Sequence, residues 1–594
     1  MGVLSLGLVL GGCSGPPAGS TGSDTPDVPS VGLSDNSAAR EVFDGGAVKS
    51  SLAASAAFFS SSPSAVVLAS PSAGTAPAAQ APETLALTGQ AAAAAAGLGI
   101  PLLVAEPGSE QLVAGELDRL GATSVILYGT PESGWPHTVG ERTQVPGPSD
   151  ATGFDSVLGL QTDAAGSAAT GTDAVGEEGL VAGIAAMAAG ERLMVPGLQD
   201  PGASPVPDAS PVPDASPSAG SSPSGSASPR PSETSSPSEA TGELPDFKPS
   251  SNPSDAVVLT TSDPASAGAV ATARAAGAEV RVVGTPDPRA DAATIELLRS
   301  HRGDSIYAVG DAFGGTENFS AQTAVALDAP ELPGGGQTVF PGRRMVALYG
   351  HPSGPSLGVL GEQGPAEAIQ LARNTAAQYQ PHSEEPVVPA LEIITTVASS
   401  EAGEDGNYSA ETPVDELRPW VDAAGEAGVY VVLDLQPGLS SFLDQAVRYK
   451  ELLQLPHVGL ALDSEWRIEP GQRHLEQIGS VDAAEVNEVS AWLADLTRDN
   501  VLPQKVFMLH QFNLSMIRNR GQLNVSHPEL AVSLHADGHG DPGQKLDTWN
   551  VLRSGLQPEI WPGWKNFHDE DTPMLTPEQT FTQVSPKPWF VSYQ

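Results

Sequence analysis

The sequence has a single cysteine, Cys13, and few basic or aromatic residues. One cysteine excludes a disulfide framework and a zinc site built on cysteine ligands. The chain has 28 Lys and Arg residues against 71 Asp and Glu residues, which gives a formal charge of −43. A chain this acidic would repel phosphate backbones, so we expect no nucleic-acid partner. Beyond the N-terminal residues, no apolar run is long enough to span a membrane.

The position of Cys13 predicts a lipid anchor. Residues 3–12 are apolar, and the cysteine follows directly after Leu-Gly-Gly. This segment resembles a bacterial lipobox, although the basic residues that usually open a signal peptide are missing. The resemblance implies that residues 1–13 are a lipoprotein signal segment and that lipidated Cys13 anchors the protein on the extracellular face of the cell membrane. The abundance of Ala, Gly and Pro resembles actinobacterial composition. The alternative is a chance apolar start.

Two segments have the composition of disordered chain. Residues 14–62 are rich in Ser, Gly, Pro and Ala, which predicts a disordered tether. Residues 201–253 contain a literal repeat, SPVPDA at 204–209 and again at 210–215, followed by Ser-Pro runs. Pro-rich composition of this kind predicts an extended linker.

Related α/β units flank the second of these segments, at residues 63–200 and 254–342. Each begins with a buried strand pattern, at 65–68 and at 256–259, and continues with an Ala-rich helix, a second strand, a second helix and a third strand. The pattern predicts a Rossmann-like β-α-β-α-β unit of parallel strands, present twice. Neither copy has a G-x-G-x-x-G motif, so we expect no nucleotide cofactor.

The first unit resembles the cell-wall-binding repeat of type 2. The residues that carry the resemblance are ELDRLGA at 116–122 and VILYG at 125–129, with Thr130 where the family has a second glycine. The second copy is weaker. The resemblance implies that these units bind a cell-wall polysaccharide or peptidoglycan.

Residues 343–594 hold seven of the eight tryptophans and nine of the eleven histidines. Helical patterns separate most of eight strand-like runs, which lie at 345–351, 388–397, 430–436, 458–466, 505–512, 530–538, 563–571 and 589–594. Alternation of this length is typical of a (β/α)8 barrel, the TIM-type fold. We therefore predict an α/β protein with two Rossmann-like units followed by such a barrel.

Side chains alternate between the lumen and the helices along a barrel strand. When the leucines and valines face outward, polar groups near the ends of three runs face the lumen: Asp434 and Gln436, Asp463 and Glu465, and His535 and Asp537. His510, Glu392, Tyr593 and the acidic residues around Asp569 are expected to join them. Polar residues at strand ends often cap helices, but several converging carboxylates repel one another unless a site uses them. Active sites of such barrels lie at this end.

Lumenal carboxylates with neighbouring aromatics favour glycoside hydrolysis, which needs one protonated and one ionised carboxyl group. The barrel loosely resembles glycoside hydrolases that carry the acid on strand four and the nucleophile on strand seven. We expect Glu465 to be the general acid, Asp463 to raise its pKa, and Asp537 or Asp569 to be the partner carboxylate. The expected substrate-binding residues are Asp434, Gln436, Trp466, His510, His535, Trp564 and Tyr593.

Two alternatives stay open. A metal-dependent hydrolase could use His535, Asp537, His539 and Asp541, which alternate along the sequence, and His510 and His568 could join them. The barrel could also bind glycan without turnover. Our prediction has no metal ligand and no cofactor.

Overall fold

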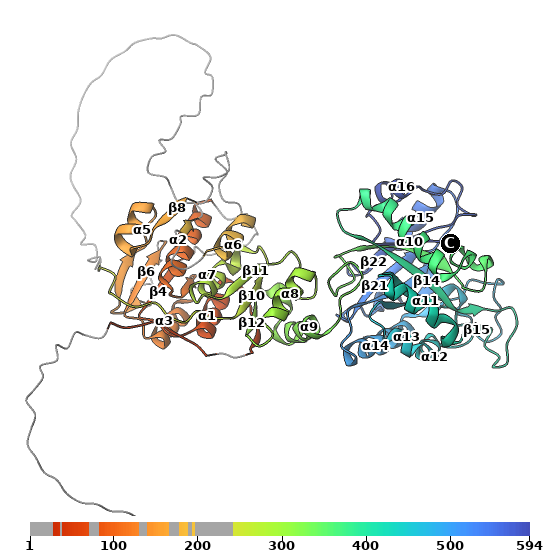
Figure 1. The fold of residues 1–594 in the computed structure, drawn as a ribbon, viewed down its shortest axis with the longest axis horizontal. Helices are drawn as coiled ribbons and strands as arrows, with labels where there is room; N and C mark the ends of the chain where they lie inside the picture. The colour runs from red at the N-terminus through yellow and green to blue at the C-terminus, as the bar shows by residue number, and fades with distance from the viewer. Residues whose placement is uncertain are drawn as a thin grey trace, which may run out of the picture.

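The computed structural model describes residues 28–35, 38–69, 82–129, 139–164, 177–187, 193–195 and 242–594. An N-terminal α/β region is followed by a C-terminal barrel (Figure 1). Cys13 and most of the predicted linker lie outside the described residues.

Both predicted α/β units are present as four-stranded parallel sheets. The first sheet has the order β5-β4-β6-β7, with β4 (Ser64–Ala69), β5 (Leu102–Ala105), β6 (Ser124–Tyr128) and β7 (Thr143–Pro146). The second has the order β11-β10-β12-β2, with β10 (Val257–Thr260), β11 (Glu279–Val282), β12 (Ile306–Val309) and β2 (Arg40–Phe43). In each unit the first strand of the predicted motif lies between the second and the third.

The prediction that residues 14–62 form a disordered tether is wrong for its C-terminal part. Strand β2 pairs with β12 of the second unit, helix α1 (Gly46–Phe58) follows it, and β1 (Gly32–Leu33) pairs with β3 (Phe59–Ser61). The small Ser and Ala side chains that suggested a tether are buried on α1, including Ser51, Ala54 and Ser55. They permit close packing of the helix, and composition alone does not distinguish this use from disorder.

The two units share one hydrophobic core, which includes the alanines of α2 (Pro82–Leu98) and α7 (Ala267–Ala275). Side-chain hydroxyl groups cover the backbone of edge strand β5. Leu102 N donates to Thr272 Oγ1 over 3.0 Å, and Val104 N donates to Ser51 Oγ over 3.0 Å. These bonds satisfy edge N–H groups that an open strand would leave unpaired, so the units pack as one body.

The described end of the predicted linker, residues 242–253, belongs to this body. Val31 N donates to Lys248 O over 2.9 Å, Lys248 N donates to Pro29 O over 2.9 Å, and Phe247 packs against the shared core. The linker therefore has a packed C-terminal end.

We predict that deleting residues 205–240 leaves the thermal unfolding midpoint of the full chain nearly unchanged, because their Pro-rich sequence predicts an extended linker. Changes in such segments alter stability by about 0.5 kcal/mol or less. Differential scanning calorimetry checks this. The matched deletion of residues 243–250 should lower the midpoint, since it removes Phe247 and the bonds of Lys248. Equal midpoints for the two deletions would contradict the assigned boundary.

The C-terminal region is a closed barrel of eight parallel strands, as predicted. The order around the barrel is β13-β23-β22-β21-β19-β17-β16-β14, and β14 pairs with β13 to close it. The strands are β13 (Arg344–Gly350), β14 (Val387–Ala398), β16 (Tyr430–Leu435), β17 (Val458–Asp463), β19 (Lys505–Gln511), β21 (Leu530–Ala536), β22 (Trp561–Asn566) and β23 (Phe590–Tyr593).

Helices surround the strands and bury an outer apolar layer. They are α10 (Pro365–Tyr379), α11 (Val414–Glu426), α12 (Phe442–Arg448), α13 (Lys450–Leu453), α14 (Ala483–Asp499), α15 (Pro542–Arg553) and α16 (Pro577–Gln583). No helix among the residues listed above is both long enough and apolar enough to cross a membrane.

The barrel floor is closed by residues 332–340, which the sequence predicts as the end of the second α/β unit. Leu332, Val339 and Phe340 pack into the lower lumen with Met345 and Met508. This apolar plug fills the strand-start end of the barrel, so polar side chains of the lumen gather at the opposite end.

Candidate functional site

The upper lumen contains the polar residues that strand alternation predicted. Asp434, Asp463, His510 and His535 come from four different strands and are almost wholly buried. Glu392 of β14 joins them, also fully buried. Parallel strands present their C-terminal ends at one rim of a barrel, which explains how residues far apart in sequence converge here.

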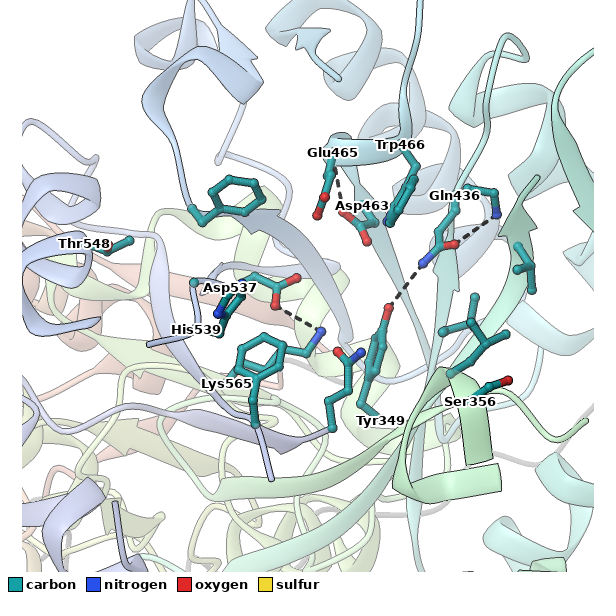
Figure 2. A pocket seen from close by; sticks show the side chains of 18 residues that line it. Tyr349, Ser356, Gln436, Asp463, Glu465, Trp466, Asp537, His539, Thr548 and Lys565 are labelled. Atoms are coloured by element: carbon teal, nitrogen blue, oxygen red, sulfur yellow. Dashed lines mark hydrogen bonds and ion pairs between the residues drawn. The ribbon is translucent and has the colours of Figure 1, made fainter. Parts of the chain in front are cut away.

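A pocket of about 400 Å³ opens above these residues (Figure 2). Asp463, Glu465 and Asp537 point into it from β17, the short helix η6 (Ser464–Trp466) and the segment after β21. Aromatic rings contribute to its wall: Tyr349, Trp466, Phe512 and Phe567. The structure thus brings together three of the four predicted catalytic residues.

Glu465 has the properties of a proton donor. Its backbone N–H donates to Asp463 Oδ1 over 3.3 Å, which fixes the turn that carries it. Burial raises the pKa of Glu465 to about 7, and the Asp537 carboxylate adds to this effect, while Lys565 and His510 act in the opposite sense. The expected neighbour Asp463 also interacts with Glu465, but that repulsion raises the pKa of Asp463, and Asp537 is the neighbouring charge that raises the pKa of Glu465. Burial and then Asp434 raise the pKa of Asp463 itself well above its usual value.

Asp537 has the surroundings of an ionised carboxylate. Its Oδ1 lies 3.0 Å from Lys565 Nζ, and its Oδ2 lies 2.8 Å from His510 Nδ1. Burial alone would raise the pKa of Asp537, but Lys565 and His510 hold it below its usual range. Two carboxyl groups with opposite protonation preferences therefore face one pocket.

Sequence reasoning missed Lys565 and Tyr349. Lys565 Nζ lies 3.5 Å from the centre of the Tyr349 ring, and Tyr349 Oη donates to Asp434 Oδ2 over 2.9 Å. The alternation of β22 contained the signal for the lysine, since Gly563 and Lys565 share one face. We had instead assigned function to the acidic residues that follow the strand.

Six predicted site residues do not line the pocket. Three of them, Asp434, His510 and His535, are buried in the lumen. The other three lie outside the lumen. Asp569 is exposed in the turn after β22. Trp564 packs outside the barrel against Trp549, with ring centres 5.7 Å apart. Tyr593 also faces the helices, and its hydroxyl lies 2.6 Å from that of Tyr379. Along their strands, Trp564 and Tyr593 alternate with Lys565 and Ser592, which face the lumen. Trp564 and Tyr593 therefore face the helices, and their assignment to substrate binding is wrong.

Two other predicted binding residues line the pocket. Trp466 is partly exposed and meets the His474 ring edge-on, with centres 5.4 Å apart. Gln436 Oε1 accepts a hydrogen bond from Ala398 N over 3.0 Å, while its Nε2 lies 3.4 Å from Tyr349 Oη. The pocket therefore has an aromatic face beside amide and carboxyl groups.

The metal ligands considered from sequence do not form one cluster. Asp541 caps α15 by accepting from Gln544 N over 3.0 Å, and His539 packs its ring against Phe567. Of the residues considered, His510, His535 and Asp537 lie at the lumen, whereas His568 is exposed. His535 Nε2 lies 3.2 Å from Ser592 Oγ.

No family model and no curated protein matches the chain. Among solved structures, the chain is similar to Cwp6 from Clostridium difficile, with 13% sequence identity and a TM-score of 0.30. The match covers 67% of this chain and 63% of that one, so it spans less than two thirds of the neighbour's length. The fold and the site together define a (β/α)8-barrel protein with a carboxylate-lined pocket at the C-terminal ends of its strands.

Proposed function

We propose that the barrel hydrolyses glycosidic bonds of a cell-wall polysaccharide, with Glu465 as general acid and Asp537 as the ionised partner. The observation that carries the proposal is the pair of carboxyl groups in one pocket, one with its pKa raised to about 7 and the other paired with Lys565 at 3.0 Å. Environments that push two carboxyl pKa values apart assign the acid and the base in glycosidases.

The pocket also suits a sugar. Trp466 and Phe512 offer apolar faces, and Gln436 offers an amide beside them. Glu465 would protonate the leaving oxygen, and the Asp537 carboxylate would stabilise the positive charge that develops on the sugar ring. Lys565 and His510 would keep Asp537 oriented through its two oxygens.

Hydrolysis should fall as pH rises through about 7, because the neutral form of Glu465 is the active one. The groups that face Glu465 are Asp463, Asp537, Lys565 and His510. The profile of kcat/KM against pH on a panel of wall polysaccharides and peptidoglycan measures this limb. A panel that gives binding but no turnover at any pH would favour the glycan-binding alternative and contradict the proposal.

At the cell surface, the α/β region would hold the protein on wall polymer and lipidated Cys13 would hold it on the membrane. We predict that Cys13→Ala releases the full chain into the medium, because the cysteine is the acceptor of the lipid. Immunoblots of membrane and medium fractions measure the distribution. A Ser14→Ala variant is the control, and retention of Cys13→Ala in the membrane fraction would refute the anchor.

A further inference from the structure

A second group of side chains lies below the pocket. Glu392 of β14, His510 of β19 and His535 of β21 are fully buried, and none of them lines the pocket. One carboxylate oxygen and one ring nitrogen from each histidine lie within 4.8 Å of one another. The three residues come from separate strands of a rigid barrel, so their positions are fixed by the fold.

The ring nitrogens that face Glu392 are the ones that would bind an ion: His510 Nε2 hydrogen-bonds to Glu392 Oε1, and His535 Nδ1 has no hydrogen-bond partner among the described residues. Glu392 Oε1 lies 2.8 Å from His510 Nε2 and 4.0 Å from His535 Nδ1. The other nitrogen of each ring already has a partner: His510 Nδ1 lies 2.8 Å from Asp537 Oδ2, and His535 Nε2 lies 3.2 Å from Ser592 Oγ. Metal-binding histidines characteristically use their second nitrogen in this way, which fixes ring orientation and tautomer.

Two polar atoms of this group lack a hydrogen-bond partner among the described residues, namely Glu392 Oε2 and His535 Nδ1. Both belong to side chains with no exposed surface. Buried polar atoms are almost always satisfied, so an unpaired carboxylate oxygen and an unpaired imidazole nitrogen on these two side chains point to an ion bound by the group.

The charge around the group favours a cation. Five carboxyl side chains face the upper lumen or the pocket: Glu392, Asp434, Asp463, Glu465 and Asp537. Lys565 is the one lysine or arginine among the residues that line the described pocket. A divalent ion would offset this excess of acidic groups.

We propose that Glu392, His510 and His535 bind one divalent transition-metal ion, of the zinc or iron(II) class. Two imidazoles and one carboxylate suit these ions, whereas magnesium and calcium prefer oxygen ligands alone. The ion replaces the proton on His510 Nε2 and accepts the free lone pair of His535 Nδ1. It lies behind the pocket and contacts Asp537 only through the His510 ring. The proposal shares His510 and His535 with the residues considered from sequence and adds Glu392 as the carboxylate ligand, and it does not depend on glycan hydrolysis.

The test is metal binding by the full chain without any glycan. After treatment with a chelator, the protein should bind one equivalent of Zn²⁺ by isothermal titration calorimetry and should develop visible absorption bands with Co²⁺. Glu392→Gln and His535→Gln should each weaken Zn²⁺ binding by at least about 100-fold. Ser592→Ala should weaken it by about 10-fold, because it frees only the outer nitrogen of His535.

His539→Gln is the matched control, since His539 lies in the pocket outside the ligand set and should leave Zn²⁺ binding unchanged. Circular dichroism and unfolding midpoints show whether each variant is folded. If a variant does not fold, the Zn²⁺ stoichiometry and Co²⁺ spectrum of the wild type decide. A wild type without Zn²⁺ binding, or unchanged binding in a folded Glu392→Gln variant, would overturn the metal site. Neither result would bear on hydrolysis, which the glycan panel tests separately.

Discussion

Glu465→Gln is expected to lower kcat on a wall polysaccharide by about 10²–10⁴-fold, the usual contribution of a general acid. Glutamine keeps the shape of the side chain but has no acidic proton to give to the leaving oxygen. The main-chain bond from Glu465 N to Asp463 Oδ1 stays intact, so the pocket and much of the binding affinity should persist. Steady-state kinetics with a binding measurement on the same polysaccharide separates the two effects.

A substrate with a very good leaving group distinguishes an acid from a structural residue. The dinitrophenolate group of a dinitrophenyl glycoside of the same sugar departs without protonation. Glu465→Gln should therefore hydrolyse this substrate almost as fast as the wild type. Asp569→Asn is the control, because Asp569 is exposed outside the pocket and should behave as wild type. Equal polysaccharide turnover by the wild type and Glu465→Gln would remove Glu465 from the mechanism.

Asp571→Asn is expected to destabilise the chain by about 3–5 kcal/mol, the cost of leaving a buried charge without its partner. Asp571 forms an ion pair with Lys545, and both side chains are almost fully buried. Asp571 also accepts from Phe567 N and Gly540 N, each over 3.0 Å. Urea unfolding followed by tryptophan fluorescence measures the free-energy change.

The double variant Lys545→Met/Asp571→Asn tests whether the unpaired charge causes the loss of stability. Lys545 Nζ donates to Lys565 O over 2.7 Å, so Lys545 also binds the backbone of β22 at the residue whose ammonium group lines the pocket. Removing both charges should recover part of the lost stability, because no charge is left unpaired. A double variant as unstable as the sum of the single variants would show that the two side chains contribute independently.

The barrel could be predicted from the sequence because each strand places several apolar residues on the side that packs against the helices. Val431, Leu433 and Leu435 set the parity of β16, and the same alternation placed Asp434 correctly in the lumen. The parity of β22 was misread because Trp564 is aromatic and was taken for a sugar-stacking residue. Its neighbour Lys565 faces the pocket and pairs with Asp537, while Trp564 packs against Trp549.

Other features depend on contacts between distant segments and could not be predicted in this way. No local pattern shows that His510 lies 2.8 Å from Glu392 and 2.8 Å from Asp537, since the distances arise from barrel closure. The raised pKa of Glu465 depends mainly on burial, which is a property of the folded pocket.

Strand β2 has a consequence for how the chain can be divided. Residues 40–43 complete a sheet whose other strands come from residues 257–309, so a segment that precedes the first α/β unit belongs to the second, and the second unit is not an excisable module. A fragment that begins at residue 254 would expose the edge of β12, and open edges promote aggregation. A recombinant form of the second unit must therefore also include the segment that carries β2.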